Sequence, residues 1–148
     1  EMLEYTYVNG NAYGTTKKSV EEARARGKNV ILDVDTIGAM KIRALCPDAT
    51  LIYILPPSWD ELKSRLSSTG IYTEEEVNAL MEIAEEEISC ANSYDYILVN
   101  DTISNTLSRF AQIIHSNRYS RNCMKEFLDS YIDGEVKPHV QSYKEALL

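Results

Sequence analysis

Residues 27–39, which read GKNVILDVDTIGA, constrain the fold of this chain more than any other stretch. The apolar run at residues 30–32 follows a glycine, which is typical of a buried parallel strand. Because side chains alternate along a strand, we expect Asp33 and Asp35 on the same side, just before a helix. In open α/β sheets the ligand crevice lies beyond the carboxyl ends of the strands.

A simpler alternative is that one of these two aspartates caps the next helix and the other is solvated. Two carboxylates side by side repel each other unless a cation, a proton or a donor-rich ligand lies between them. For a pair on one face at the end of a strand, we therefore expect a site.

Composition narrows the class of protein. The chain has 148 residues, 44% of them hydrophobic, which is enough for a domain with a core and excludes a disordered chain. We expect no membrane span, because no apolar run approaches the roughly 18 residues that a span needs. With 15 basic against 23 acidic residues the net charge is −8, and no basic stripe suggests a nucleic-acid partner.

Three cysteines at positions 46, 90 and 123 are odd in number and far apart, as expected for reduced thiols in a cytoplasmic protein. With the two histidines they show no zinc-ligand spacing. No secretory signal is recognisable at the start of the sequence. The first residue is Glu, so we expect a fragment or a processed product.

The elements expected along the chain alternate between strands and helices. Residues 1–14 predict two strands around an Asn9-Gly10 turn, and a helix follows, capped by Thr15 or Thr16 and ended by Gly27. Further strands are expected at residues 30–35, 50–55 and 96–99. Further helices are expected at residues 36–45, after Ser58, after Thr73, after Asp101, and in the tail up to Gly134, with a short final helix after Pro138. Capping boxes of Ser58 with Glu61 and of Thr73 with Glu76 are expected to begin two of them, and Asp101 is expected to cap a third. This order is typical of a parallel sheet wrapped by helices.

Helical spacing also predicts which faces are buried. The inner residues expected of the helix at 36–45 are Ile37, Met40 and Leu45. Those of the helix after Thr73 are Val77, Leu80, Met81, Ala84 and Ile88, with an acidic opposite face of Glu82, Glu85, Glu86 and Glu87. Those of the helix after Asp101 are Ile103, Leu107, Phe110 and Ile114.

Several of these blocks together resemble one family. Residues 4–118 are similar to the latter two-thirds of a guanylate kinase, and the matching blocks agree in order and spacing. They are EYTYVNGNAYGTT (4–16), GKNVILDVDTIGA (27–39), PDATLIYILPPSWDELKSRL (47–66) and EEEISCANSYDYILVND (85–101). Any one block would be weak support, but their combination is specific.

The resemblance implies an α/β fold of the P-loop kinase type, N-terminally incomplete, in which helices flank a parallel sheet. It also implies a small GMP-binding β segment and a helical C-terminal tail. The expected domains are residues 1–28 as part of the GMP-binding subdomain, residues 29–118 as the α/β core with a lid at about 67–82, and residues 119–148 as a helical extension.

Site residues follow from the same resemblance. It implies that GMP is bound by four residues, Glu4, Tyr13, Thr15 and Asp35. Glu4 would accept the N1 and N2 hydrogens of guanine, Thr15 would donate to O6, and Tyr13 would reach the GMP phosphate. Asp33 would lie near Mg²⁺, Arg65 would face the transferred phosphoryl group, and Asn100 would border the ATP base. Taken singly, each has a plainer role: a helix cap for Thr15, a turn for Asn100, and an (i, i+4) pair with Glu61 for Arg65.

The implied reaction is ATP + GMP → ADP + GDP, with GMP, ATP and Mg²⁺ as ligands. Two departures weaken that expectation. The sequence contains no G-x-x-x-x-G-K-[S/T] loop, which wraps the ATP phosphates, and Thr69 and Leu80 stand where the family has lid arginines. We expect low activity, and none from these residues alone. The alternative is a module that binds GMP or a protein ligand without phosphoryl transfer. A homo-oligomer is left open.

Overall fold

The computed structural model describes residues 2–8 and 11–134, and the chain forms two compact units, residues 1–101 and 102–148. The expected Asn9-Gly10 turn and the helix expected after Pro138 lie outside the described residues. Each unit is described by itself below, beginning with the first. The domain boundaries expected from the resemblance remain predictions.

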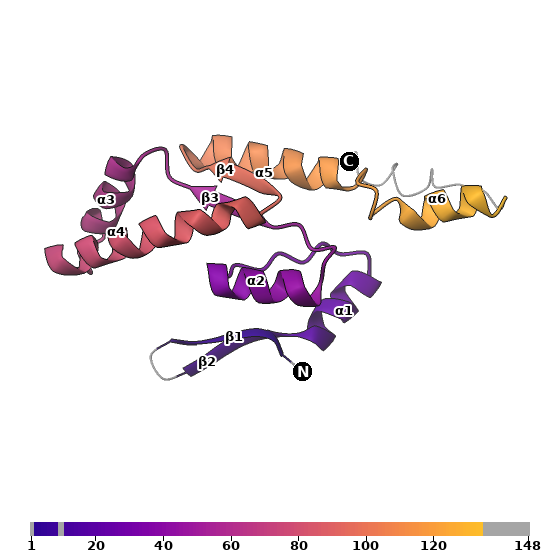
Figure 1. Ribbon diagram of the computed structural model, residues 1–148, viewed down its shortest axis with the longest axis horizontal. Helices are drawn as coiled ribbons and strands as arrows, with labels where there is room; N and C mark the ends of the chain where they lie inside the picture. The colour runs from indigo at the N-terminus through magenta and orange to yellow at the C-terminus, as the bar shows by residue number, and fades with distance from the viewer. Residues whose placement is uncertain (1, 9–10, 135–148) are drawn as a thin grey trace. The chain divides into compact units, whose positions relative to one another are not determined.

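The first unit begins with the expected antiparallel pair of strands. Strand β1 (Met2–Val8) pairs with β2 (Asn11–Thr16), with a register irregularity near the start of β1 (Figure 1). Helix α1 (Lys17–Ala25) follows at once, because the Thr16 hydroxyl accepts a hydrogen bond from the Ser19 N–H at 3.1 Å and so caps the helix. The helix ends at Ala25, and Gly27 just beyond its C-cap has a φ of +72°, the left-handed conformation typical of helix ends.

The segment at residues 28–35 is not the predicted strand. It has no strand assignment, and within the described ranges no other strand pairs with it. Its exposure nevertheless alternates as in a strand: Ile31, Asp33 and Asp35 are exposed, while the residues between them are half-buried. Apolar alternation favours an extended backbone, but a strand also needs a hydrogen-bonding neighbour, and the local sequence cannot supply one.

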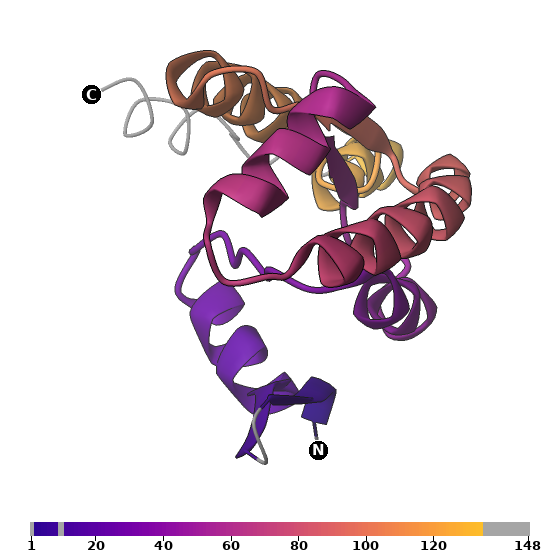
Figure 2. The ribbon, with the colours of Figure 1, turned by 90° about the vertical axis from the view of Figure 1, so that its left-hand side faces the viewer.

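Strands β3 (Ile52–Leu55) and β4 (Tyr96–Val99) form a parallel pair, with Ile52 opposite Tyr96 and Leu55 opposite Val99. The crossover between them consists of α3 (Trp59–Ser68), α4 (Glu74–Ile88) and the short 3₁₀ helix η1 (Ser89–Ser93). Helices α3 and α4 contact each other (Figure 2), and Lys63 donates to Asn78 across them at 3.1 Å. The predicted α/β class with a parallel sheet is confirmed.

Both crossover helices have the N-terminal caps that the sequence indicated. Ser58 accepts from the Glu61 N–H at the start of α3. Thr73 and Glu76 form a complete capping box at the start of α4, each side chain accepting from the other residue's backbone N–H. The helices therefore begin where short-range signals place them.

Helix α2 (Thr36–Leu45) has the predicted bounds but a different buried face. Its buried residues are Gly38, Ala39 and Ile42, whereas Ile37 and Leu45, predicted to point inward, are 66% and 60% exposed. The small residues Gly38 and Ala39 let a neighbouring element approach closely, and α2 lies against β1. The buried hydrophobic residues of the described chain all belong to this first unit: Ala39, Ile42, Leu51, Val77, Ala91 and Leu98.

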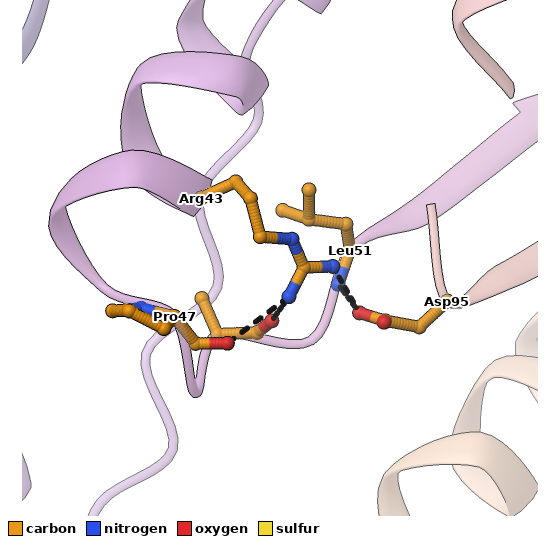
Figure 3. Close-up of polar contacts among 5 residues, drawn as sticks. Arg43, Pro47, Leu51 and Asp95 are labelled. Carbon is orange, nitrogen blue, oxygen red and sulfur yellow. Dashed lines mark hydrogen bonds and ion pairs between the residues drawn. The ribbon is translucent and has the colours of Figure 1, made fainter. Parts of the chain in front are cut away.

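Arg43, near the end of α2, clamps the chain where the two parallel strands begin (Figure 3). One guanidinium nitrogen donates to the Pro47 and Ala49 carbonyls at 3.1 and 2.9 Å, and the other donates to Asp95 at 2.6 Å. The same Asp95 oxygen accepts from the Leu51 N–H at 2.8 Å. This network fixes the loop between α2 and β3 and ties it to the residue that precedes β4.

The second unit contains α5 (Ile103–Asn117) and α6 (Lys125–Ile132). The cap of α5 is Thr102, not Asp101 as predicted, because the Thr102 hydroxyl accepts from the Asn105 N–H at 3.2 Å. The predicted inner stripe of α5 is only partly covered: Ile103 is 79% exposed and Leu107 61%, whereas Phe110 and Ile114 are half-buried. Helix α6 ends at Ile132, close to the predicted stop at Gly134, whose φ is +75°.

Candidate functional site

Asp33 and Asp35 lie on the same exposed side of the segment that leads into α2. Asp35 is the N-cap of this helix, and its Oδ1 accepts from the Gly38 N–H at 2.7 Å. The simpler alternative, a cap beside a solvated aspartate, therefore describes their local contacts. Capping uses one carboxylate oxygen of Asp35, and it fixes this side chain at the positive end of the α2 dipole, which also attracts ligand anions.

The hairpin places the other predicted GMP-binding positions together. The register sets Glu4 directly opposite Thr15, and Tyr13 is opposite Thr6. By strand alternation, positions 4, 13 and 15 belong to one face of the ribbon. Thr15 is half-buried and is not the helix cap, since Thr16 has that role. Because α2 lies against β1, the strand that carries Glu4 adjoins the helix that Asp35 caps.

Arg65 is in direct contact with Asn100. The resemblance assigned Arg65 to the transferred phosphoryl group and Asn100 to the ATP side. The Arg65 Nη2 donates to the Asn100 backbone carbonyl at 3.0 Å, and Nε donates to the Glu61 carboxylate at 2.7 Å. Asn100 continues the parallel ladder by donating its N–H to the Leu55 carbonyl at 2.7 Å. Arg65 therefore lies at the carboxyl end of the parallel pair, where ligands bind in open α/β sheets.

The two lid positions that depart from the family have local structural roles. The Thr69 hydroxyl donates to the Leu66 carbonyl at 2.8 Å and accepts from the Ile71 N–H at 3.2 Å, which closes the last turn of α3. Leu80 is half-buried on the α4 stripe that includes the buried Val77, as its spacing predicted. Neither side chain carries a positive charge that could neutralise a transferring phosphoryl group.

A polar cluster beside Asp35 was not predicted. The Thr36 hydroxyl donates to Glu87 at 3.2 Å, so this glutamate of α4 is half-buried and does not belong to the exposed acidic face assigned to it. The rings of Tyr53 and Tyr94 meet edge to face with centroids 4.9 Å apart. Thr36 and Glu87 lie 51 residues apart in the sequence, and the two tyrosines lie about 40 residues apart. No short-range spacing could have indicated either pair.

Burial, and to a lesser extent nearby ionisable side chains, raises the pKa of both tyrosines in this cluster. Burial raises the pKa of Tyr94, and the Tyr53, Cys90, Glu87 and Asp35 side chains raise it further. Burial likewise raises the pKa of Tyr53, with Glu87 and Cys90 as smaller causes. Glu87 of α4 and Asp35, the cap of α2, therefore both lie close enough to Tyr94 to raise the pKa of its phenol.

Asp33 has the chemistry expected of a residue near Mg²⁺. Its carboxylate is exposed and supplies the hard oxygen that Mg²⁺ prefers. Within residues 2–8 and 11–134, no group of three or more His, Cys, Asp or Glu side chains could hold a metal ion by itself. Mg²⁺ commonly binds through one or two carboxylates and substrate phosphates, so the role expected of Asp33 does not require such a group. The described helices include none that is both long and apolar enough to cross a bilayer.

Comparison with known proteins shows the family that this chain resembles. The family model described as guanylate kinase matches residues 1–117. A guanylate kinase of Clostridium acetobutylicum is 40% identical over 143 residues, covering 96% of this chain and 67% of the relative. One from Francisella tularensis is 44% identical over 117 residues, covering 78% and 62%.

A solved structure is also similar. The crystal structure of guanylate kinase from Anaplasma phagocytophilum matches with a TM-score of 0.64 at 30% identity, covering 81% of this chain and 57% of that one. The chain thus spans between 57% and 67% of the length of these three relatives. From the family match, the identities and the shared fold, we conclude that the chain belongs to the guanylate kinase family.

Proposed function

We propose that the whole protein transfers a phosphoryl group from ATP to GMP, giving ADP and GDP, and that these residues supply GMP recognition and part of the phosphate side. The observation that carries the proposal is the register of the hairpin, in which Glu4 of β1 is opposite Thr15 of β2. Strand β1 also adjoins α2, the helix that Asp35 caps. A carboxylate that accepts the two parallel N–H donors of guanine selects GMP over AMP, because adenine has no such pair.

In the proposed reaction the protein positions its substrates and stabilises charge, without a covalent intermediate. Glu4, Tyr13, Thr15 and Asp35 hold GMP. Arg65 meets the transferring phosphoryl group, and Asn100 borders the ATP base. Asp33 would help hold Mg²⁺ through its carboxylate, and the metal would supply positive charge that neutralises the phosphate oxygens. The reaction is proposed to take place in the cytoplasm, consistent with three cysteines that form no disulfide.

A second candidate is a module that binds GMP or a protein ligand without phosphoryl transfer. The observation that favours it is the lid, where Thr69 closes α3 and Leu80 packs on the stripe of α4. One lid arginine can be worth ~10³-fold in rate, so its replacement can abolish transfer while leaving GMP binding intact.

The test compares this chain with a completed one. The part of the Clostridium acetobutylicum relative that this chain does not span is fused to it, and GMP-dependent ADP release is measured beside GMP binding. We expect the fusion to turn over more slowly than roughly 1–100 s⁻¹, the range typical of kinases. We expect the 148 residues alone to bind GMP without turnover. GMP binding without turnover by the fusion would contradict the kinase proposal and leave the binding module.

A further inference from the structure

The same capping pattern begins α3 and α4, but its glutamate is used differently in the two helices. At α4, Glu76 accepts from the backbone N–H of Thr73 at 2.8 Å and completes the capping box. At α3, Ser58 accepts from the Glu61 N–H, yet the Glu61 side chain binds the Nε of Arg65 at 2.7 Å. The carboxylate of Glu61 thus serves the arginine one turn later and not the helix terminus.

Two contacts fix the guanidinium of Arg65 in both position and plane. Nε–H donates to Glu61 from within the same helix, and Nη2–H donates to the Asn100 carbonyl at the end of β4, 3.0 Å away. The side chains of Arg65 and Glu61 are 38% and 44% exposed, so the pair is partly shielded from water. Because a guanidinium is a rigid plane with five N–H donors, holding it at two of them also orients the others.

These contacts leave the Nη1 edge of Arg65, which neither Glu61 nor the Asn100 carbonyl occupies, for a ligand. The guanidinium lies at the carboxyl end of the parallel pair, and a planar donor edge matches the oxygens of a phosphate group. We propose that Glu61 is a positioning residue, which together with the Asn100 carbonyl presents the Nη1 edge of Arg65 to a nucleotide phosphate. This inference rests on the proposed function and adds a residue to it.

The sign of the electrostatic effect separates this role from an ordinary surface ion pair. Removing a carboxylate near an anion site should strengthen anion binding, since it removes like-charge repulsion. If Glu61 orients Arg65, removing its charge should instead weaken binding, because the guanidinium is no longer held. Asp60 is the matched control: it is exposed, lies in the same first turn of α3 and carries the same charge.

The experiment titrates the full chain with inorganic tripolyphosphate and follows the Arg65 Nε–H resonance by NMR. We expect Glu61→Gln to weaken tripolyphosphate binding by about threefold to tenfold, the loss of one net hydrogen bond. We expect Asp60→Asn to strengthen it or leave it unchanged. In an Arg65→Ala background, where affinity is followed by calorimetry, Glu61→Gln should have no further weakening effect. Unfolding curves of each variant identify any loss that comes from misfolding.

Tighter or unchanged binding in Glu61→Gln would overturn the inference, as would equal weakening of GMP binding in that variant. A wild-type Arg65 resonance that does not move with tripolyphosphate, in a chain that binds GMP, would overturn the inference and leave the proposed function standing. A chain that binds tripolyphosphate through Arg65 but does not bind GMP would contradict the proposed function and support the role of Glu61.

Discussion

The hairpin and the lid segment, residues 67–82, follow the guanylate kinase pattern to different degrees. In the hairpin, Glu4 and Thr15 are both present and are paired in the strand register. In the lid, Thr69 and Leu80 replace the expected arginines and are used for helix closure and packing. Under the proposed function, nucleotide recognition and phosphoryl transfer depend on separate parts of the chain, so that one can be retained while the other is weakened.

Restoring the lid arginines should change the turnover rate more than any other substitution should. In the fusion completed with the relative's segment, Thr69→Arg with Leu80→Arg should raise turnover by on the order of 10²–10³-fold, because arginine neutralises charge in the transition state. Stopped-time assays of ADP release would measure it.

The matched control for that substitution is Thr69→Gln, which adds length without charge. Thr69 is exposed, so it accepts a longer side chain more readily than the half-buried Leu80. Equal rates in the arginine and glutamine variants at position 69 would contradict the claim that missing positive charge limits the lid.

Glu4→Gln tests the hairpin. We expect the GMP dissociation free energy to fall by roughly 1.5–3 kcal/mol, since a neutral amide replaces a charge-assisted acceptor. Calorimetry with GMP would measure this, with the exposed Glu21→Gln on α1 as the control for net charge. Unchanged GMP affinity would mean that Glu4 is not part of the GMP site. The hairpin would then follow the family pattern no better than the lid does.

Arg43→Met should lower stability without acting on either region directly. We expect the free energy of unfolding to fall by about 1–2 kcal/mol, because the Asp95 carboxylate and two carbonyls lose a charged donor. Urea unfolding would measure it, with the exposed Arg24→Met as the control. A drop no larger than that of the control would show that the clamp is an ordinary surface pair.

The smallest effect expected is a loss of stability at alkaline pH. The pKa values of Tyr53 and Tyr94 are raised above their ordinary value of 10.0, so above that pH the unfolded chain releases protons that the folded chain retains. The tyrosines' contribution is thus fully present below pH 10.0 and is lost as pH rises through their raised folded-state pKa.

Urea unfolding between about pH 8 and pH 11 would show this fall. Tyr94→Phe should make it shallower, because the titrating phenol is gone. Glu87→Gln should also make it shallower, because Glu87 raises the pKa of both rings. If stability falls with pH equally steeply in the wild type and in Tyr94→Phe, the polar cluster beside Asp35 does not form in solution.

Local chemistry was readable from the sequence. The capping box of Thr73 and Glu76, the end of α1 near Gly27 and the alternation that puts Asp33 and Asp35 on one side all depend on neighbours within a few residues. The parallel pairing of β3 and β4 followed from the order of strands and helices.

What the sequence did not show depends on distant partners. The segment before α2 has the alternation of a strand but no strand beside it in the described part of the chain. The clamp of Arg43 on Asp95 and the bond of Thr36 to Glu87 join residues 52 and 51 positions apart. Glu61 matched a capping box, yet Arg65 competes for it one turn away. The two long-range contacts have no signature in local spacing, whereas the (i, i+4) pair of Glu61 and Arg65 was one of the alternatives that local spacing offered.

The most direct test of the account is a calorimetric titration of the 148-residue chain with GMP and, separately, with AMP. We expect GMP binding with a dissociation constant of about 1 μM to 100 μM, and AMP binding at least about 100-fold weaker, because adenine leaves the carboxylate of Glu4 without its two donors. Equal affinity for the two nucleotides, or no binding of GMP, would contradict the claim that this chain retains the guanine site of its family.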